Sequence, residues 1–158
     1  MNTLTCSFTG HREIFFSHWS TLPEKLSDTI DALIASGVGK FCSGGAMGFD
    51  LIAAEAVIKK RDSGADIKLC MVLPCRDQAA RWGYAQREQY ETVLSLADEV
   101  IYLSEKYDRF CMQQRNIRLV DECDILLSYH VKESGGTAHT VNYAMQKNKK
   151  IVNLADFL

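Results

Sequence analysis

The sequence predicts a doubly wound α/β domain with a mostly parallel sheet of about six strands and helices on both faces. Short apolar runs alternate with longer amphipathic segments along the whole chain, and glycine or proline separates many of them. Residues 67–73 are apolar almost throughout, which is typical of a parallel strand covered on both faces. No repeat, low-complexity tract or Pro/Ser-rich linker marks a second domain, so we expect residues 1–158 to form one domain.

The expected strands are short and most of them end in small or polar residues. They cover residues 4–9, 40–43, 67–73, 99–103, 124–129 and 150–154. The expected helices cover residues 22–36, about 47–61, about 80–96, 110–123 and about 137–147. The first helix has the clearest pattern, because Pro23 suits its first turn, Gly37 follows its end, and apolar residues recur every three or four positions. These apolar residues are Leu22, Leu26, Ile30, Leu33 and Ile34.

The positions of the polar loops predict the order of the strands. Three polar or glycine-rich loops follow the first, second and fifth strands, and they can form one site only if those strands are neighbours. Placing the first strand between the second and the fifth gives the order 4-3-2-1-5-6, with the topological switch point where the three loops meet.

The overall charge gives no general attraction to nucleic acid or to an anionic membrane. The formal net charge is −2, with 47% hydrophobic and 24% charged residues. We therefore expect no membrane partner and do not expect nucleic acid as a partner, so an anion site must be local. The chain opens on a strand pattern, and no apolar run approaches the length of a membrane span, which predicts a cytoplasmic protein.

The six cysteines favour neither a metal site nor disulfides. They form no CxxC pair and have no histidines at zinc spacing, so we expect reduced thiols, no metal and no cofactor. Cys75 follows Pro74 at a predicted strand end, and we expect it to be the most exposed of the six.

The loop after the first strand offers four functional groups in a row: Thr9, Gly10, His11 and Arg12. Arg12 can make a bidentate contact with phosphate, and Thr9 can donate a hydrogen bond beside it. His11 has two interpretations. In the first it contacts a ligand or acts as a general acid/base, and in the second it is a packed histidine that is hydrogen-bonded to the backbone.

A glycine-rich turn joins the second strand to the next helix. Its candidate ligand-binding residues are Ser43, Gly44, Gly45, Met47, Gly48 and Asp50. The turn is neither GxGxxG nor a P-loop, but glycines let a ligand approach the backbone, and a helix start leaves amides free for an anion. Asp50 lies in the first helical turn. Its carboxylate has two alternative roles there, capping the helix or binding a ligand hydroxyl, and the sequence does not decide between them.

A second glycine turn follows the fifth strand and repeats this arrangement with Ser134, Gly135, Gly136 and Thr137. Two helix starts flanking one crevice would suit the phosphate and ribose of a nucleotide. Gln113, Gln114, Arg115 and Asn116 lie near the start of the preceding helix. We expect that start on the opposite edge of the sheet unless its loop folds over the site, and a solvated helix face is the alternative.

Three motifs together resemble the SLOG superfamily of Rossmann-like proteins, and within it the YpsA-like branch. They are Phe8-Thr9-Gly10-His11-Arg12, the eight residues from Ser43 to Asp50, and Gly135-Gly136-Thr137. The stretch from Trp82-Gly83-Tyr84 through Arg87-Glu88-Gln89-Tyr90 to Ala97-Asp98 resembles that branch as well, so the likeness covers nearly the whole chain. The resemblance implies a nucleotide or nucleotide-derived ligand at the strand ends. The superfamily also includes cytokinin-activating phosphoribohydrolases and the single-strand-binding DNA-processing protein A.

The sequence departs from the phosphoribohydrolases where they carry a catalytic glutamate. No carboxylate follows Thr137 here, and the remaining candidates for N-glycosidic cleavage are Asp50, Glu133 and His139. Our leading hypothesis is therefore a sensor or regulatory module that binds a nucleotide-derived small molecule, with an N-glycosidic hydrolase of nucleoside monophosphates as the alternative.

Two further hypotheses concern macromolecular partners, namely single-stranded DNA and other copies of this chain. Single-stranded DNA binding is the second alternative to nucleotide binding, but the sequence shows no basic, aromatic groove. Tyr84, Tyr90 and Val93 leave a homo-oligomer open, although core packing explains them equally well.

Overall fold

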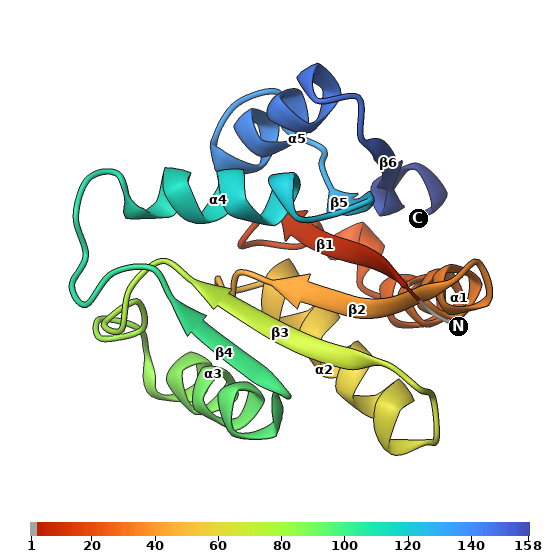
Figure 1. Cartoon of the computed structure of the whole chain (residues 1–158), viewed down its shortest axis with the longest axis horizontal. Helices are drawn as coiled ribbons and strands as arrows, with labels where there is room; N and C mark the ends of the chain where they lie inside the picture. Colours follow the sequence, from red (N-terminus) through yellow and green to blue (C-terminus); the bar gives the residue numbers. More distant parts are fainter. Residues whose placement is uncertain (1–2) are drawn as a thin grey trace.

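Six strands form one all-parallel sheet in the computed structural model, which describes residues 3–158 (Figure 1). Their order is β4-β3-β2-β1-β5-β6, so the predicted class and strand order are confirmed. The strands are β1 (Leu4–Gly10), β2 (Val38–Ser43), β3 (Lys68–Leu73), β4 (Glu99–Tyr102), β5 (Ile125–Tyr129) and β6 (Lys150–Asn153). All carboxyl ends therefore lie along one edge of the sheet, and the switch point falls between β1 and β5.

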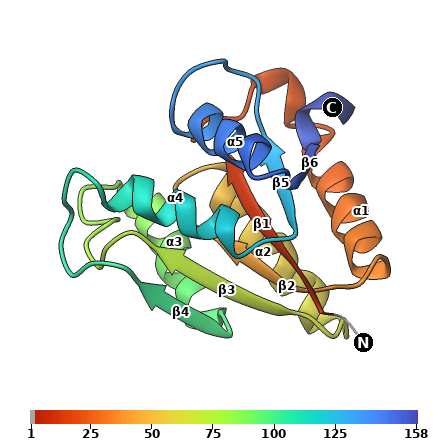
Figure 2. The ribbon, with the colours of Figure 1, turned by 45° about the horizontal axis from the view of Figure 1, so that its top comes forward.

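Helices cover both faces of this sheet (Figures 1 and 2). α1, α2 and α3 pack on one face, and α4 and α5 pack on the other. The helices are α1 (Leu22–Ala35), α2 (Phe49–Asp62), α3 (Tyr84–Leu96), α4 (Cys111–Asp121) and α5 (Gly136–Gln146), with two short 3₁₀ helices, η1 (Phe16–His18) and η2 (Leu154–Phe157). Within residues 3–158, no helix is both long enough and apolar enough to cross a bilayer.

Strand β3 is buried on both faces, as its apolar run predicts. Leu69, Met71 and Leu73 belong to the main core under α1, α2 and α3, whereas Cys70 and Val72 pack with residues on the opposite face. Successive side chains of a strand point to opposite faces, so one apolar run serves both layers.

Helix α1 forms where its sequence pattern predicts it. Pro23 lies in its first turn, and Leu22, Leu26 and Ile30 are buried against the sheet. The chain leaves the helix through Gly37, whose φ of +111° is a left-handed conformation that glycine adopts without strain.

Helix α3 begins at Tyr84 and not near residue 80, so the expected start is wrong by four residues. The preceding segment makes two separate turns, in which Ala80 N–H donates to the carbonyl of Asp77 and Trp82 N–H donates to that of Ala79, both at 3.1 Å. Gly83, in an extended conformation, is the N-cap of the helix. The segment before α3 is therefore a loop at the carboxyl edge of the sheet.

Burial corrects the expectation that Cys75 is exposed and confirms core packing for Tyr90 and Val93. Cys75 is fully buried, and all six cysteines are buried with free thiols. Tyr90 and Val93 are also buried in the core, which leaves Tyr84, 75% exposed, as the only one of the three residues available to a partner.

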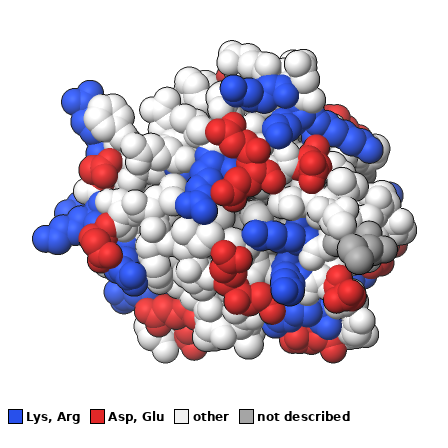
Figure 3. Space-filling model, in the orientation of Figure 1, with Lys and Arg blue, Asp and Glu red and all other residues white. Residues whose placement is uncertain are grey.

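Charges of both signs are mixed on the face of the molecule shown in Figure 3. Lysine and arginine side chains lie among aspartates and glutamates there, as expected for a net charge of −2. This face does not present a broad field of one sign to a polyanion.

Candidate functional site

A cavity of about 540 Å³ lies at the switch point, where the loops after β1 and β5 meet the start of α2 and the side of α4. We refer to it as the switch-point cavity. Nine of the residues predicted to form the site line it: Thr9, Gly10, His11, Arg12, Asp50, Ser134, Gly135, Gly136 and Thr137. The structure therefore brings the first loop, Asp50 and the second glycine turn together around one space.

The first glycine turn lies behind the wall of this cavity. Ser43, Gly44, Gly45 and Gly48 line neither this cavity nor the one beside it. The Ser43 hydroxyl donates to the backbone carbonyl of Asp50 at 2.9 Å and accepts the N–H of Gly45 at 3.2 Å. Within this structure the turn fixes the start of α2 and so positions Asp50.

The amino end of α2 is occupied by the protein itself. The N–H of Phe49, the first residue of α2, donates to the backbone carbonyl of His11 at 3.1 Å. This bond ties the first loop to the helix start and removes one of the amides that an anion would use.

Asp50 presents a buried carboxylate oxygen without a partner. The side chain is 5% exposed and lines the switch-point cavity. Its Oδ2 accepts the N–H of Ala46 at 3.4 Å, but within residues 3–158 nothing bonds to Oδ1. Burial raises the pKa of Asp50 from 3.8 to about 6, and the positive charge of Arg115 offsets part of that rise. A buried acceptor of this kind needs a donor from a ligand or water.

Arg115 is buried and lines the switch-point cavity, as does Asn116, which corrects the alternative interpretation of Arg115 as part of a solvated helix face. The side chain is 4% exposed, donates to the carbonyl of Gly44, and donates through Nε to Oδ1 of Asn116 at 2.8 Å. Burial lowers the pKa of its guanidinium, and Asp50 opposes that change. The expectation that α4 starts on the opposite edge is also wrong, because a helix that follows a parallel strand starts at the carboxyl edge.

His11 is bonded to the backbone, in agreement with the second interpretation of this residue. Its Nε2 accepts the N–H groups of Val131 and Lys132 at 3.0 and 3.1 Å. These two bonds hold the loop after β1 against the loop after β5, on the wall of the switch-point cavity. Burial lowers the pKa of His11, with smaller electrostatic contributions from Lys132 and His130.

We therefore expect His11 to make stability depend on pH in a known direction. The unfolded chain takes up a proton near the ordinary pKa of 6.5, whereas native His11 resists protonation, so the contribution of His11 to stability should fall as the pH drops below about 6.5. NMR titration of the His11 ring protons should show a pKa below 6.5. A ring that titrates at or above 6.5 would contradict this assignment.

The second glycine turn leaves the start of α5 open to the cavity. Gly135, with a φ of +99°, is the N-cap, and no side chain of the described residues caps this helix. A Cβ on Gly135 or Gly136 would meet nothing within 4 Å, so the backbone here faces open space. The first-turn amides of α5 thus point to a place that an anion can occupy.

Arg12 is exposed on the wall of the same cavity, and its backbone rests on Gly48. A Cβ on Gly48 would collide with the Arg12 carbonyl, and Gly48 has a φ of +82°. Within the described part of the chain, Arg12 forms no ion pair. Its guanidinium is therefore available to a ligand.

Replacing Gly48 with alanine should cost more stability than the same change at Gly64. Both glycines have left-handed φ angles, but a Cβ on Gly64 would meet nothing within 4 Å. We expect a loss of about 1 kcal/mol for Gly64→Ala from backbone strain and about 2–4 kcal/mol for Gly48→Ala, where a clash is added. Urea denaturation of both variants measures the difference, and equal losses would contradict the described contact with Arg12.

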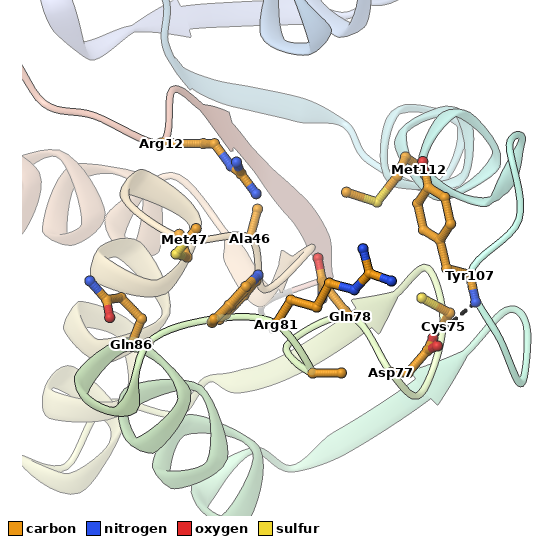
Figure 4. Close-up of a pocket in the computed structure, with 13 residues that line it drawn as sticks. Arg12, Ala46, Met47, Cys75, Asp77, Gln78, Arg81, Gln86, Tyr107 and Met112 are labelled. Carbon is orange, nitrogen blue, oxygen red and sulfur yellow. Dashed lines mark hydrogen bonds between the residues drawn. The ribbon is translucent and has the colours of Figure 1, made fainter.

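A second cavity of about 830 Å³ adjoins the first one, and we call it the adjoining cavity. Arg12, Ala46 and Met112 line both cavities, so the two lie side by side, and we refer to them together as the cleft. The other walls come mainly from the loop before α3 and from Tyr107, as Figure 4 shows. Met47, predicted as part of the site, lines this second space.

Several wall residues of the switch-point cavity were not predicted. They are Glu13, Ala46, Met112 and Lys132. Ala46 lies inside the glycine motif and Glu13 follows Arg12 directly, so proximity in sequence could have found both. Lys132 lies two residues before Ser134 in the loop after β5, so proximity applies to it as well, whereas Met112 enters from α4 and leaves no sequence signal.

The three candidates for glycosidic cleavage are separated. Only Asp50 lines the switch-point cavity, whereas His139 lines a third cavity of about 460 Å³ between α4 and α5. Glu133 is exposed and lines none of the three cavities. In residues 3–158, no group of three or more His, Cys, Asp or Glu side chains could hold a metal ion.

Residues 9–156 match the family model YpsA, which describes the YspA SLOG family. The chain is 29% identical over 155 residues to UPF0398 protein BH1768 of Halalkalibacterium halodurans, a match that covers 94% of this chain and 82% of that protein. It is 25% identical over 132 residues to UPF0398 protein YpsA of Bacillus subtilis, covering 82% of this chain and 72% of that protein.

Solved structures share the fold at low sequence identity. DNA processing protein A from Streptococcus pneumoniae matches with a TM-score of 0.67 and 16% identity, over 94% of this chain but 49% of that one. DNA processing protein A from Helicobacter pylori, which binds single-stranded DNA, has a TM-score of 0.67 and 18% identity over 94% of this chain and 63% of that chain. The protein TM1055 has a TM-score of 0.61 and 17% identity, covering 94% and 72%.

Proposed function

The chain belongs to the YspA SLOG family, and we propose that it binds a nucleotide or a nucleotide-derived ligand in the switch-point cavity, as a sensor or regulatory module. One observation supports this proposal above the others. The unpartnered Oδ1 of Asp50 and the uncapped start of α5 line the same cavity. A ligand that carries both a hydroxyl donor and an anionic group satisfies both features.

A nucleotide has these two groups next to each other. Its phosphate would accept hydrogen bonds from the first-turn amides of α5 and from the guanidinium of Arg12. A ribose hydroxyl would donate to Oδ1 of Asp50, which supplies the missing partner of a buried acceptor. Thr9 and Thr137, which also line the cavity, offer hydroxyls to the remaining oxygens.

We propose binding without cleavage. Asp50 is the one candidate for glycosidic chemistry on the cavity wall, and Glu13 is the only other carboxylate among its lining residues. Asp50 is also the partner that we assign to a ribose hydroxyl. Incubation with labelled nucleoside monophosphates should release no free base over several hours, and steady release by wild type that Asp50→Asn abolishes would establish the hydrolase alternative.

Single-stranded DNA is a second candidate ligand, and the cleft removes one argument against it. The sequence shows no basic, aromatic groove, yet the fold gathers Arg12, Arg81, Trp82 and Tyr107 around the adjoining cavity. The fold likeness to a protein that binds single-stranded DNA also counts against our expectation that nucleic acid is not a partner. A gel shift with a salt-sensitive band would favour this candidate.

A thermal-shift screen with nucleotides and ADP-ribose derivatives tests the proposed function. At least one compound should raise the melting temperature of the wild type, and Arg12→Ala should weaken its binding about tenfold or more, through loss of a charge-assisted contact. Arg12 is exposed and unpaired in the described chain, so the ligand-free melting temperature should not change.

Arg87→Ala is the matched control, because Arg87 is exposed on α3 and lines none of the cavities. This variant should respond to the ligand as the wild type does. No shift with any compound, together with an Arg12→Ala variant that behaves as wild type in every assay, would refute the proposed function.

A further inference from the structure

The adjoining cavity is large enough to take a ligand group of its own. Its volume is about 830 Å³ and that of the switch-point cavity is about 540 Å³. Small-molecule sites in proteins begin at roughly 300 Å³, so each cavity by itself is in the range of a binding site. Because the two share Arg12, Ala46 and Met112, one molecule can extend from the first into the second.

Two guanidinium groups enter this space. Figure 4 shows Arg12 and Arg81 reaching into the cavity from opposite sides. Neither forms an ion pair within the described part of the chain. The one acidic residue on the wall is Asp77, whose Oδ1 accepts the backbone N–H of Tyr107 at 2.9 Å. The free positive charges therefore favour an anionic group between the two arginines.

Aromatic and thioether side chains form much of the remaining wall. Trp82 is half-buried and packs edge-to-face on Tyr90, with ring centroids 5.1 Å apart. Because Tyr90 is buried, this contact holds the Trp82 ring in place. Tyr107 is 63% exposed and lies on the wall with Met112 (Figure 4). Met47 completes this surface. Rings and polarizable sulfurs of this kind suit the flat face of a nucleobase.

We propose that the adjoining cavity binds the second nucleoside of a two-part ligand, a pyrophosphate-linked dinucleotide. Its bridging phosphates lie by Arg12 and Arg81, and its second base packs against Trp82 and Tyr107. The first nucleoside occupies the switch-point cavity, so this assignment rests on the proposed function.

Calorimetric titration with matched ligand pairs tests this assignment. The probes are the four common nucleoside monophosphates and the four corresponding symmetric dinucleoside pyrophosphates. For at least one base, the dinucleotide should bind tenfold or more tightly than the monophosphate. Arg81→Gln should remove most of that gain and leave monophosphate affinity within twofold, because Arg81 lines only the adjoining cavity.

Two further variants make the test independent of a single side chain. Tyr107→Ala removes an exposed ring and should reduce the same gain, whereas Arg87→Gln makes the same charge change outside both cavities and should alter neither affinity. Urea midpoints close to that of the wild type will show that these variants fold.

The outcomes separate this assignment from the proposed function. Binding of monophosphates without any gain for dinucleotides overturns the second subsite alone, and no binding in either series overturns both. Equal weakening of monophosphate and dinucleotide by Arg81→Gln also overturns it. A ten-nucleotide DNA strand that binds more tightly than every dinucleotide would assign the cleft to a single strand instead.

Discussion

Replacing Asp50 with asparagine is expected to make the protein more stable at pH 7 and to weaken its binding of the ligand. Native Asp50 keeps its proton up to a pH of about 6, whereas the unfolded chain loses it near 3.8. The contribution of Asp50 to stability therefore falls as the pH rises from about 4 to about 6, opposite in direction to that of His11, and the loss persists at pH 7. Asparagine does not ionise, so Asp50→Asn should gain roughly 1–3 kcal/mol at pH 7.

The same substitution should weaken ligand binding about tenfold, because the neutral amide oxygen of asparagine accepts a weaker hydrogen bond than the carboxylate. Urea denaturation and calorimetric titration measure the two effects on one sample. The control is Asp66→Asn, an exposed aspartate away from the cavities, which should change neither quantity. A variant that is less stable than the wild type and still binds fully would show that Asp50 serves the fold and not a ligand.

Replacing Arg115 with methionine should destabilise the fold clearly more than the loss of an exposed arginine on the same helix. The substitution leaves the Asp50 carboxylate buried without a counter-charge and removes the donor to the Gly44 carbonyl. Leaving the buried Gly44 carbonyl without its charged donor costs about 1–3 kcal/mol, and weaker electrostatic stabilisation of the Asp50 carboxylate adds to this loss. Urea denaturation at pH 7 should show a loss of this size.

Two comparisons identify the cause of that loss. Arg118→Met, on the same helix, removes a partly exposed pair with Glu122 and should cost less than about 1 kcal/mol. The double variant Asp50→Asn/Arg115→Met should lose less than the sum of the two single changes, because Arg115 then has no carboxylate to stabilise. If Arg115→Met and Arg118→Met lose the same stability, the proposed interaction of Arg115 with Asp50 is wrong.

The fold could be predicted because its signals are local. The apolar runs, the helical periodicity of residues such as Leu22 and Leu26, and the polar strand ends gave the class and the strand order that the structure confirms. The start of α3 could not be predicted in this way. There, turns at Asp77 and Ala79 and a bond from Tyr107 N–H to the Asp77 side chain hold the chain as a loop, and Tyr107 is distant in sequence.

The cleft, like the fold, could be predicted only where its residues lie close together in the sequence. The two glycine turns are visible as motifs, but their different surroundings are not. The first turn is buried, since Arg115 bonds to Gly44 and the Phe49 amide bonds to His11, whereas the second faces open space. Arg81 and Tyr107 meet only in the folded protein, so no spacing in the sequence indicates the adjoining cavity.

The most direct test of nucleotide binding is an NMR titration of ¹⁵N-labelled protein with the best compound from the thermal-shift screen. We predict saturable shifts of the Gly135 and Gly136 amides, at the start of α5, and about a tenfold higher ligand concentration for half-saturation of these shifts in Asp50→Asn. If no nucleotide or ADP-ribose derivative shifts these amides, or if saturable shifts appear only away from the switch-point cavity, the proposed binding site is wrong.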